Sequence, residues 1–101
     1  MRIAVYGRQQ STSVIPYVEQ LMVALESHQC EILLYQPFLH FLQKHSSKKY
    51  KHQTFSSNTD LRHQVDVIFS VGGDGTMLDT LTLVQDSMIP VAGVNTGRLG
   101  F

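Results

Sequence analysis

Residues 65–76 read Val-Asp-Val-Ile-Phe-Ser-Val-Gly-Gly-Asp-Gly-Thr, and this stretch decides the fold. Its first seven residues are mostly β-branched or aromatic, which is typical of a parallel strand that is covered on both faces. The three glycines that follow allow a tight turn, because glycine adopts backbone conformations that a side chain prevents. Apolar residues then recur at helical spacing until about residue 87: Met77, Leu78, Leu81 and Val84. We predict a strand, a glycine turn and a helix.

Segments on either side extend this pattern. Strands are expected at residues 2–6, 31–35 and 90–94, each ending at or near a glycine or proline. A helix is expected between the first two strands, with Ser13 as a plausible N-cap. Its apolar stripe consists of Val14, Tyr17, Val18, Leu21, Met22 and Leu25.

The remaining segments are shorter and more polar. A short helix is expected around residues 38–42 and a helical turn at 60–64, while the polar and basic segment 44–58 is interpreted as a loop. Strands that alternate with helices predict right-handed βαβ units. The expected fold is therefore a single α/β domain with an open, mostly parallel, doubly wound (Rossmann-like) sheet flanked by helices.

Composition excludes several classes of function. Hydrophobic residues make up 43% of the 101 residues, and eight Lys/Arg balance eight Asp/Glu, so no basic excess points to nucleic acid. No signal-peptide pattern opens the chain, and no apolar run approaches the ~20 residues that span a bilayer. Cys30 is the only cysteine. We expect a soluble, cytoplasmic domain that binds neither nucleic acid nor membrane.

The glycine turn also carries chemistry. Backbone N–H groups at the start of the following helix are unpaired, so they can bind an anion such as an ATP phosphate. The spacing of Thr76 and Asp79 matches a capping box. Asp74 would repel a polyphosphate, so it is expected to act as a general base or as a Mg²⁺ ligand. The alternative is a tight turn whose Asp bonds its own backbone, and the full pattern of residues favours the functional interpretation.

Two motifs resemble a known family. Gly72-Gly73-Asp74-Gly75-Thr76 is similar to the signature shared by NAD kinases, diacylglycerol and sphingosine kinases, and 6-phosphofructokinases. The second motif, Asn95-Thr96-Gly97-Arg98-Leu99-Gly100-Phe101, follows the next expected strand and closely resembles the pattern of the NAD kinases. The alternatives are a lipid or sugar kinase of the same superfamily, or a nucleotide-binding or oligomer-interface module without catalysis.

The resemblance implies a specific reaction. NAD kinases transfer the γ-phosphoryl group of ATP, or in some members of polyphosphate, to the 2′-hydroxyl of the adenosine ribose of NAD, with Mg²⁺ or another divalent cation. Asp74 matches the catalytic aspartate, which also contacts the dinucleotide. The other implied roles are a backbone contact with the dinucleotide at Gly75, an aromatic near the adenine at Phe101, a phosphate pocket shaped by Gly72, Gly73 and Thr76, and a second loop ordered by Asn95.

The resemblance also implies what lies beyond these residues. The family continues into a β-rich C-terminal domain and assembles as homodimers or tetramers. Residues 1–101 would then be an N-terminal α/β domain with little or no activity alone.

The remaining residue patterns give less support to a specific function. The five histidines follow no zinc-binding spacing, and the lysine cluster at 44–51 is interpreted as a solvated face. Arg98 could contact a phosphate or a local acid. Three methionines, Met22, Met77 and Met88, are expected in or near the core.

Overall fold

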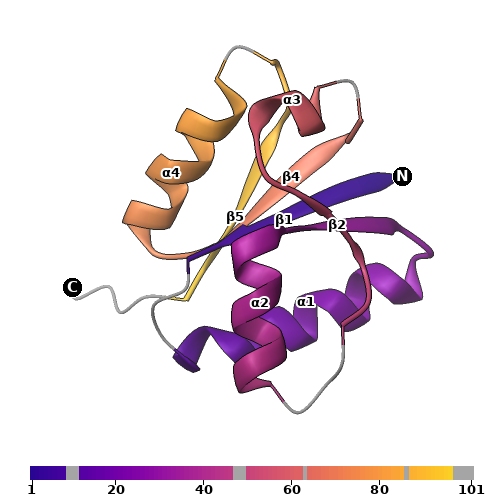
Figure 1. Ribbon diagram of the computed structural model, residues 1–101, viewed down its shortest axis with the longest axis vertical. Helices are drawn as coiled ribbons and strands as arrows, with labels where there is room; N and C mark the ends of the chain where they lie inside the picture. The colour runs from indigo at the N-terminus through magenta and orange to yellow at the C-terminus, as the bar shows by residue number, and fades with distance from the viewer. Residues whose placement is uncertain (9–11, 47–49, 63, 86, 97–101) are drawn as a thin grey trace.

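The computed structural model describes residues 1–8, 12–46, 50–62, 64–85 and 87–96. The elements run in the order β1 (Arg2–Gly7), a 3₁₀ turn (Thr12–Val14), α1 (Ile15–Ser27), β2 (Glu31–Tyr35), α2 (Gln36–His45), β3 (Gln53–Phe55), α3 (Asn58–Leu61), β4 (Val67–Gly72), α4 (Asp74–Val84) and β5 (Val91–Asn95). They form one five-stranded sheet in the order β3-β2-β1-β4-β5, in which every pairing is parallel (Figure 1). The predicted doubly wound α/β fold is confirmed.

The chain changes direction across the sheet between β1 and β4. It builds β2 and β3 on one side of β1, then crosses over to add β4 and β5 on the other side. Gly7 pairs with Val71, and Gly72 pairs with Asn95, so the carboxyl ends of β1, β4 and β5 share one edge. In open sheets of this kind, ligands bind beyond that edge at the point where the strand order reverses.

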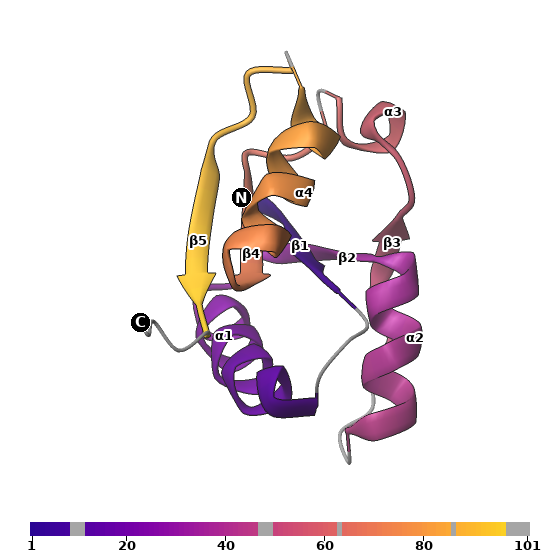
Figure 2. The ribbon, with the colours of Figure 1, turned by 90° about the vertical axis from the view of Figure 1, so that its left-hand side faces the viewer.

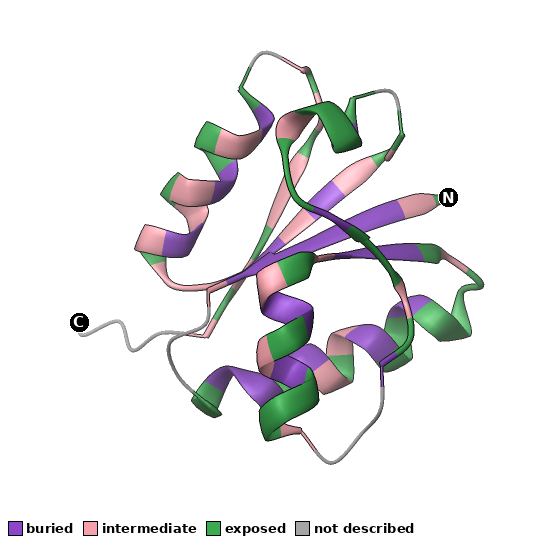
Figure 3. Ribbon diagram, viewed as in Figure 1, coloured by how far each residue is buried: buried purple, intermediate pink, exposed green. Residues whose placement is uncertain are grey.

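Two cores enclose the sheet. Ile3 and Val5 of β1 face the cluster built with α1 and α2, whereas Ala4 and Tyr6 face the opposite cluster, which includes Leu61 of α3 and Val84 of α4. Figure 2 shows the two helix pairs on opposite sides of the sheet. Because both faces of β1 are covered, the strand is buried along most of its length (Figure 3), which explains its continuous apolar sequence.

Three local predictions were wrong. The segment expected to be a loop contains β3, which pairs with β2 from Leu33–Gln53 to Tyr35–Phe55. Ser13 lies inside the 3₁₀ turn and is not the N-cap of α1, because Val14 occupies that position. Met88 is 89% exposed and therefore not part of the core.

The apolar stripes were only partly correct. Of the stripe predicted for the first helix, Val14, Val18, Met22 and Leu25 are buried as expected, Leu21 is partly buried and Tyr17 is exposed. In α4, which ends at Val84, only Val84 of the predicted apolar positions is buried. Leu78 and Leu81 of this helix are exposed. No helix in the described part of the chain is long and apolar enough to cross a membrane.

Candidate functional site

The glycine turn links the end of β4 to the start of α4. Gly72 adopts φ +149°, a conformation that disfavours any side chain. A Cβ built at Gly72 would also lie 2.5 Å from the Thr76 hydroxyl oxygen, so the buried Thr76 side chain fills the space beneath the turn. Gly73 is the N-cap in an extended conformation, and α4 begins at Asp74. The predicted strand–turn–helix unit is confirmed, with glycine required at position 72.

Two cavities flank this turn and share Gly72 and Gly73. The first, of about 110 Å³, lies toward the end of β1 and the start of α1. The second, of about 270 Å³, lies toward β5 and the start of α4. The other residues lining the first are Arg8, Ser13, Val14, Val71, Thr76 and Thr96. The other residues lining the second are Ser70, Asp74, Met77, Gly93, Val94 and Asn95.

Asp74 lies at the wall of the second cavity as the first residue of α4. Asp74 is exposed to solvent. The N–H groups of the first helical turn, which have no partner within the helix, begin at this residue. A carboxylate in this position can accept a proton from a group bound in the cavity.

The second predicted motif begins against the first. Asn95 ends β5 opposite Gly72, and the main-chain N–H of Thr96 donates a 3.1 Å hydrogen bond to the Gly72 carbonyl. The structure therefore brings Gly72, Gly73, Asp74, Thr76 and Asn95 together around the two cavities. Phe101 and Arg98 lie outside the described residues, so their predicted roles stay predictions.

The capping-box interpretation of Thr76 and Asp79 is wrong. Because α4 starts at Asp74, Asp79 lies in its second turn and faces β1 instead of the helix start. Its carboxylate accepts hydrogen bonds from Arg8 Nε at 2.5 Å, Arg8 Nη2 at 3.1 Å and the Tyr6 hydroxyl at 3.1 Å. A capping box does occur elsewhere, at the start of α3, where it joins Ser57 and Asp60.

This contact changes the ionisation of the three groups. The hydrogen bond from Arg8 holds the pKa of Asp79 below its usual value, and that same bond raises the pKa of Arg8. Burial, helped by the Asp79 charge, raises the pKa of Tyr6 to about 12. Around neutral pH the site therefore contains a guanidinium, a carboxylate and a neutral phenol.

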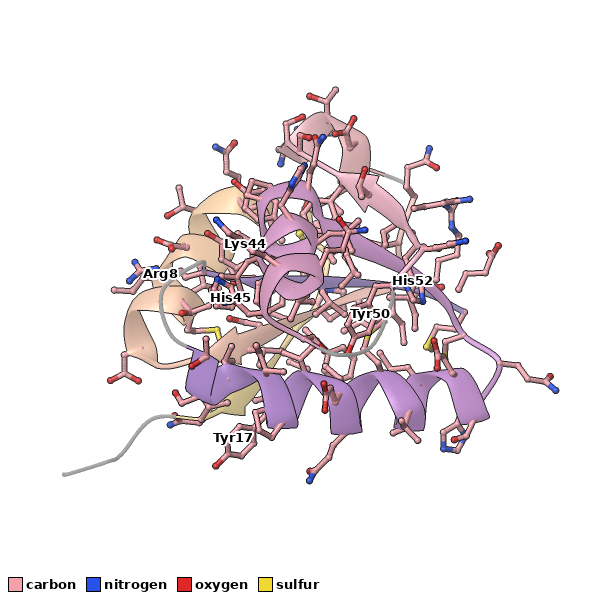
Figure 4. All side chains as sticks on the ribbon, turned by 60° about the horizontal axis from the view of Figure 1, so that its bottom comes forward. Arg8, Tyr17, Lys44, His45, Tyr50 and His52 are labelled. Atoms are coloured by element: carbon pink, nitrogen blue, oxygen red, sulfur yellow. The ribbon has the colours of Figure 1, made fainter. Side chains whose placement is uncertain are left out.

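Sequence reasoning missed Arg8, which lies in the segment expected to be a polar loop. Its guanidinium lies over the glycine turn, and a Cβ built at Gly75 would be 2.8 Å from Nη1. Figure 4 shows Arg8 next to α4, well apart from His52. Its position directly after β1, at the edge where ligands bind in such folds, was the available signal.

A buried pair of hydroxyls supports the turn from below. Thr80 is fully buried, and its Oγ1 lies 2.9 Å from Ser70 Oγ and 2.8 Å from the Thr76 carbonyl oxygen. These bonds fasten the first two turns of α4 to β4. They fix the position of the helix start, and with it Asp74, relative to the second cavity.

The donor set at the site suits a hydrated cation. Among the described residues, no three His, Cys, Asp or Glu side chains gather closely enough to hold a metal ion. Asp74 is the only carboxylate that lines either cavity in this part of the chain. Mg²⁺ commonly keeps several waters and binds through one or two carboxylates together with substrate phosphates, so a single Asp fits that mode of binding.

Comparison with known proteins identifies the family. The profile described as ATP-NAD kinase N-terminal domain matches residues 3–101. A protein named NAD kinase from Flavobacterium psychrophilum is 39% identical over 101 residues, which are all of this chain and 34% of that protein. An NAD kinase from Cytophaga hutchinsonii is 38% identical over 100% of this chain and 35% of its own length. An NAD kinase from Porphyromonas gingivalis is 34% identical over 99% of this chain and 34% of its own length.

The similarity to these relatives extends over the whole of this chain. The chain spans only about a third of their length, for example 34% of the Flavobacterium protein. The profile covers nearly all of the chain, and the parallel sheet places Gly72 of the first motif beside Asn95, the first residue of the second. The chain therefore belongs to the ATP-NAD kinase N-terminal domain family.

Proposed function

We propose that this chain is the N-terminal α/β domain of an NAD kinase, which transfers the γ-phosphoryl group of ATP to the 2′-hydroxyl of the adenosine ribose of NAD. Family membership and relatives named NAD kinase support this proposal. The observation that carries it is the position of Asp74. Its exposed carboxylate lies at the N-terminus of α4 and at the wall of a cavity of about 270 Å³.

The reaction needs little covalent chemistry from the protein. The ribose 2′-oxygen attacks the γ-phosphorus, the bond from that phosphorus to the β–γ bridging oxygen breaks, and ADP leaves. Asp74 takes the proton from the 2′-hydroxyl as charge develops on the oxygen. Phosphoryl transfer depends mainly on positioning and electrostatic stabilisation, so one aimed carboxylate with backbone donors can suffice.

Other residues bind and orient the substrates. The backbone of Gly75 contacts the dinucleotide, as does Asp74. Gly72, Gly73 and Thr76 shape the phosphate pocket, and their arrangement around two cavities supports this role. Asn95 orders the second loop where β5 ends against Gly72. Phe101 packs near the adenine.

A divalent cation, Mg²⁺ by preference, accompanies the nucleotide. When bound, it neutralises charge on the phosphates. The phosphate oxygens of the donor would hold it, because Asp74 is assigned as the base and no other carboxylate of the described residues lines either cavity. The single carboxylate among the cavity residues supports binding mainly through the substrate.

The rest of the enzyme completes the site. Because the chain matches about 34% of the length of its relatives, we propose that a β-rich C-terminal domain supplies further dinucleotide contacts and that residues 1–101 alone have little or no activity. The full-length protein is proposed to be a cytoplasmic homodimer or homotetramer that acts on NAD and ATP, without nucleic-acid or membrane partners.

Substrate comparison with the full-length protein tests this function. With ATP and Mg²⁺, we expect NADP from NAD, and no phosphorylation of diacylglycerol or fructose 6-phosphate. Phosphorylation of the lipid or the sugar instead would support the other kinases of the superfamily. Binding of NAD and ATP without turnover would support a non-catalytic module. Appreciable NADP from residues 1–101 alone would contradict the incomplete site.

A further inference from the structure

The two cavities beside the glycine turn carry opposite charges. Arg8 is the only charged side chain lining the first cavity among the described residues, and Asp74 is the only one lining the second. Gly72 and Gly73 form the wall between them. A polyphosphate is attracted to the first cavity and repelled by the carboxylate of the second, whereas a hydroxyl that must lose a proton belongs beside that carboxylate.

The size of the first cavity agrees with this division. Its volume of about 110 Å³ is well below the roughly 300–1,000 Å³ typical of a site that encloses a whole small molecule. It can hold one end of a ligand, such as a phosphoryl group, while the rest of the ligand lies outside. The N-terminal turn of α4 borders this space through Thr76.

Arg8 is held in a fixed orientation. Its Nε and Nη2 both bond to the Asp79 carboxylate, at 2.5 Å and 3.1 Å, which is the two-pronged geometry that the planar guanidinium favours. The Tyr6 hydroxyl binds the same carboxylate at 3.1 Å. The remaining nitrogen, Nη1, lies over Gly75, where a side chain would collide with it. The two hydrogen bonds to Asp79 therefore orient the guanidinium so that Nη1 points toward the glycine turn.

A contribution to stability does not by itself explain the ion pair between Arg8 and Asp79. The Arg8 and Asp79 side chains are 36% and 35% exposed, and ion pairs at that level of exposure contribute little to stability because solvent screens them. Orientation is the stronger consequence, since an arginine that is already ordered loses less conformational freedom when it binds an anion.

We infer that Arg8 binds the terminal phosphates of the phosphate donor in the first cavity, and that Asp79 is the positioning residue that aims its guanidinium. This inference rests on the proposed function and adds two residues to it. The donor lies on the Arg8 side of Gly73 and the acceptor hydroxyl on the Asp74 side. The phosphoryl group then passes over Gly73, where an added Cβ would have no neighbour within 4 Å.

Steady-state kinetics of the full-length protein test the inference. We expect Arg8→Gln to raise the KM for ATP by about 10-fold or more, the loss typical of a hydrogen bond to a charged group, and to leave the KM for NAD within about twofold. Arg8→Lys should recover part of the ATP affinity, because it restores the charge without the fork. Asp79→Asn should raise the KM for ATP by less than Arg8→Gln does.

Arg2→Gln is the matched control. Arg2 is the first residue of β1, whereas Arg8 directly follows the last, and Arg2 is also paired with a carboxylate, Glu31 at 3.7 Å. We expect its KM values and the melting temperatures of all four variants to remain close to wild type. An unchanged KM for ATP in Arg8→Gln, or a rise in the KM for NAD instead, would overturn the inference.

Direct binding separates this inference from the proposed function. Isothermal titration of the full-length protein with ATP should show about 10-fold weaker binding in Arg8→Gln than in wild type, whether or not NADP is formed. If wild type makes NADP and Arg8→Gln binds ATP normally, only the inference fails. If no NADP is formed but the affinity difference is seen, the proposed function fails and the anion site stands. An absence of ATP binding in wild type overturns the inference.

Discussion

The main-chain N–H of Thr96 donates a hydrogen bond to the carbonyl oxygen of Gly72 at 3.1 Å. This bond continues the pairing of β4 with β5 by one step, and it ties Thr96 to the glycine turn. Gly72 lines both cavities as well, so its backbone conformation influences the shape of the whole site.

Alanine substitutions in the turn separate folding from binding. Gly72→Ala should lower the free energy of unfolding by about 1–3 kcal/mol, because φ +149° and a contact of 2.5 Å with the Thr76 hydroxyl both oppose a methyl group. Gly73→Ala is the matched control, since its φ is −99° and a Cβ there has no neighbour within 4 Å. Denaturant unfolding of the full-length variants measures both, and equal stabilities would contradict the strain at Gly72.

Gly73→Ala should nevertheless affect function. Its new methyl group would enter open space at the turn shared by the two cavities, where we propose that the donor phosphate approaches the backbone. We expect a higher KM for ATP with a melting temperature near that of wild type. Unchanged kinetics would show that substrate does not approach Gly73.

Asp74→Asn tests the proposed base. The side chain is exposed, so the variant should fold with normal stability. Its turnover should fall by about 10²- to 10⁴-fold, the range typical of losing a general base. Glu31→Gln, another exposed carboxylate at the opposite end of the sheet, should keep its rate. An Asp74→Asn enzyme that retains most of its turnover would remove this residue from the mechanism.

Local sequence patterns predicted β1, β4 and the glycine turn, whose structures depend on residues close together in the sequence. Continuous apolar runs predicted β1 and β4 because both strands lie inside the sheet with helices on each face. The three glycines predicted the turn because the positive φ at Gly72 needs one of them. By contrast, β3 is a three-residue edge strand in which only Phe55 is buried, so its sequence carries almost no periodic signal.

The features that were missed depend on distant residues. Thr76 and Asp79 have capping-box spacing, but the extended conformation of Gly73 starts the helix at Asp74 and leaves Asp79 free to face β1. Its partner Arg8 is 71 residues away in sequence. That pairing arises only because the chain crosses back to place β4 beside β1, and no local pattern encodes such a contact.

The buried hydroxyl pair gives a prediction about stability. Thr80→Val preserves the shape of the side chain but removes its bonds to Ser70 Oγ and the Thr76 carbonyl. We expect a loss of about 1–3 kcal/mol in the free energy of unfolding, because buried polar groups lose their partner. Adding Ser70→Ala should cost less than the sum of the single changes, since the two hydroxyls share one bond. Strictly additive losses would show that the pair is not coupled.

The Tyr6 hydroxyl predicts how stability changes in alkali. Burial, the negative charge of Asp79 and the hydrogen bond to it raise the Tyr6 pKa from 10.0 to about 12. Between these two values the unfolded chain releases the phenolic proton while the folded protein retains it. The unfolded state therefore binds fewer protons, and the stability contributed by this group, fully present below pH 10, falls as the pH rises toward about 12.

Two variants distinguish the causes of that decline. Tyr6→Phe should be less stable than wild type near neutral pH but lose stability more slowly between pH 10 and about 12, since it has no proton to release there. Asp79→Asn leaves Tyr6 buried but removes the negative charge beside it, so the Tyr6 phenol of this variant should ionise at a lower pH than in wild type. Phenolate absorbance and denaturant unfolding measured across this range report both effects. Burial beside a carboxylate must make the folded protein resist release of the Tyr6 phenolic proton. If Tyr6→Phe and wild type lost stability in parallel between pH 10 and about 12, the folded protein would not be holding that proton.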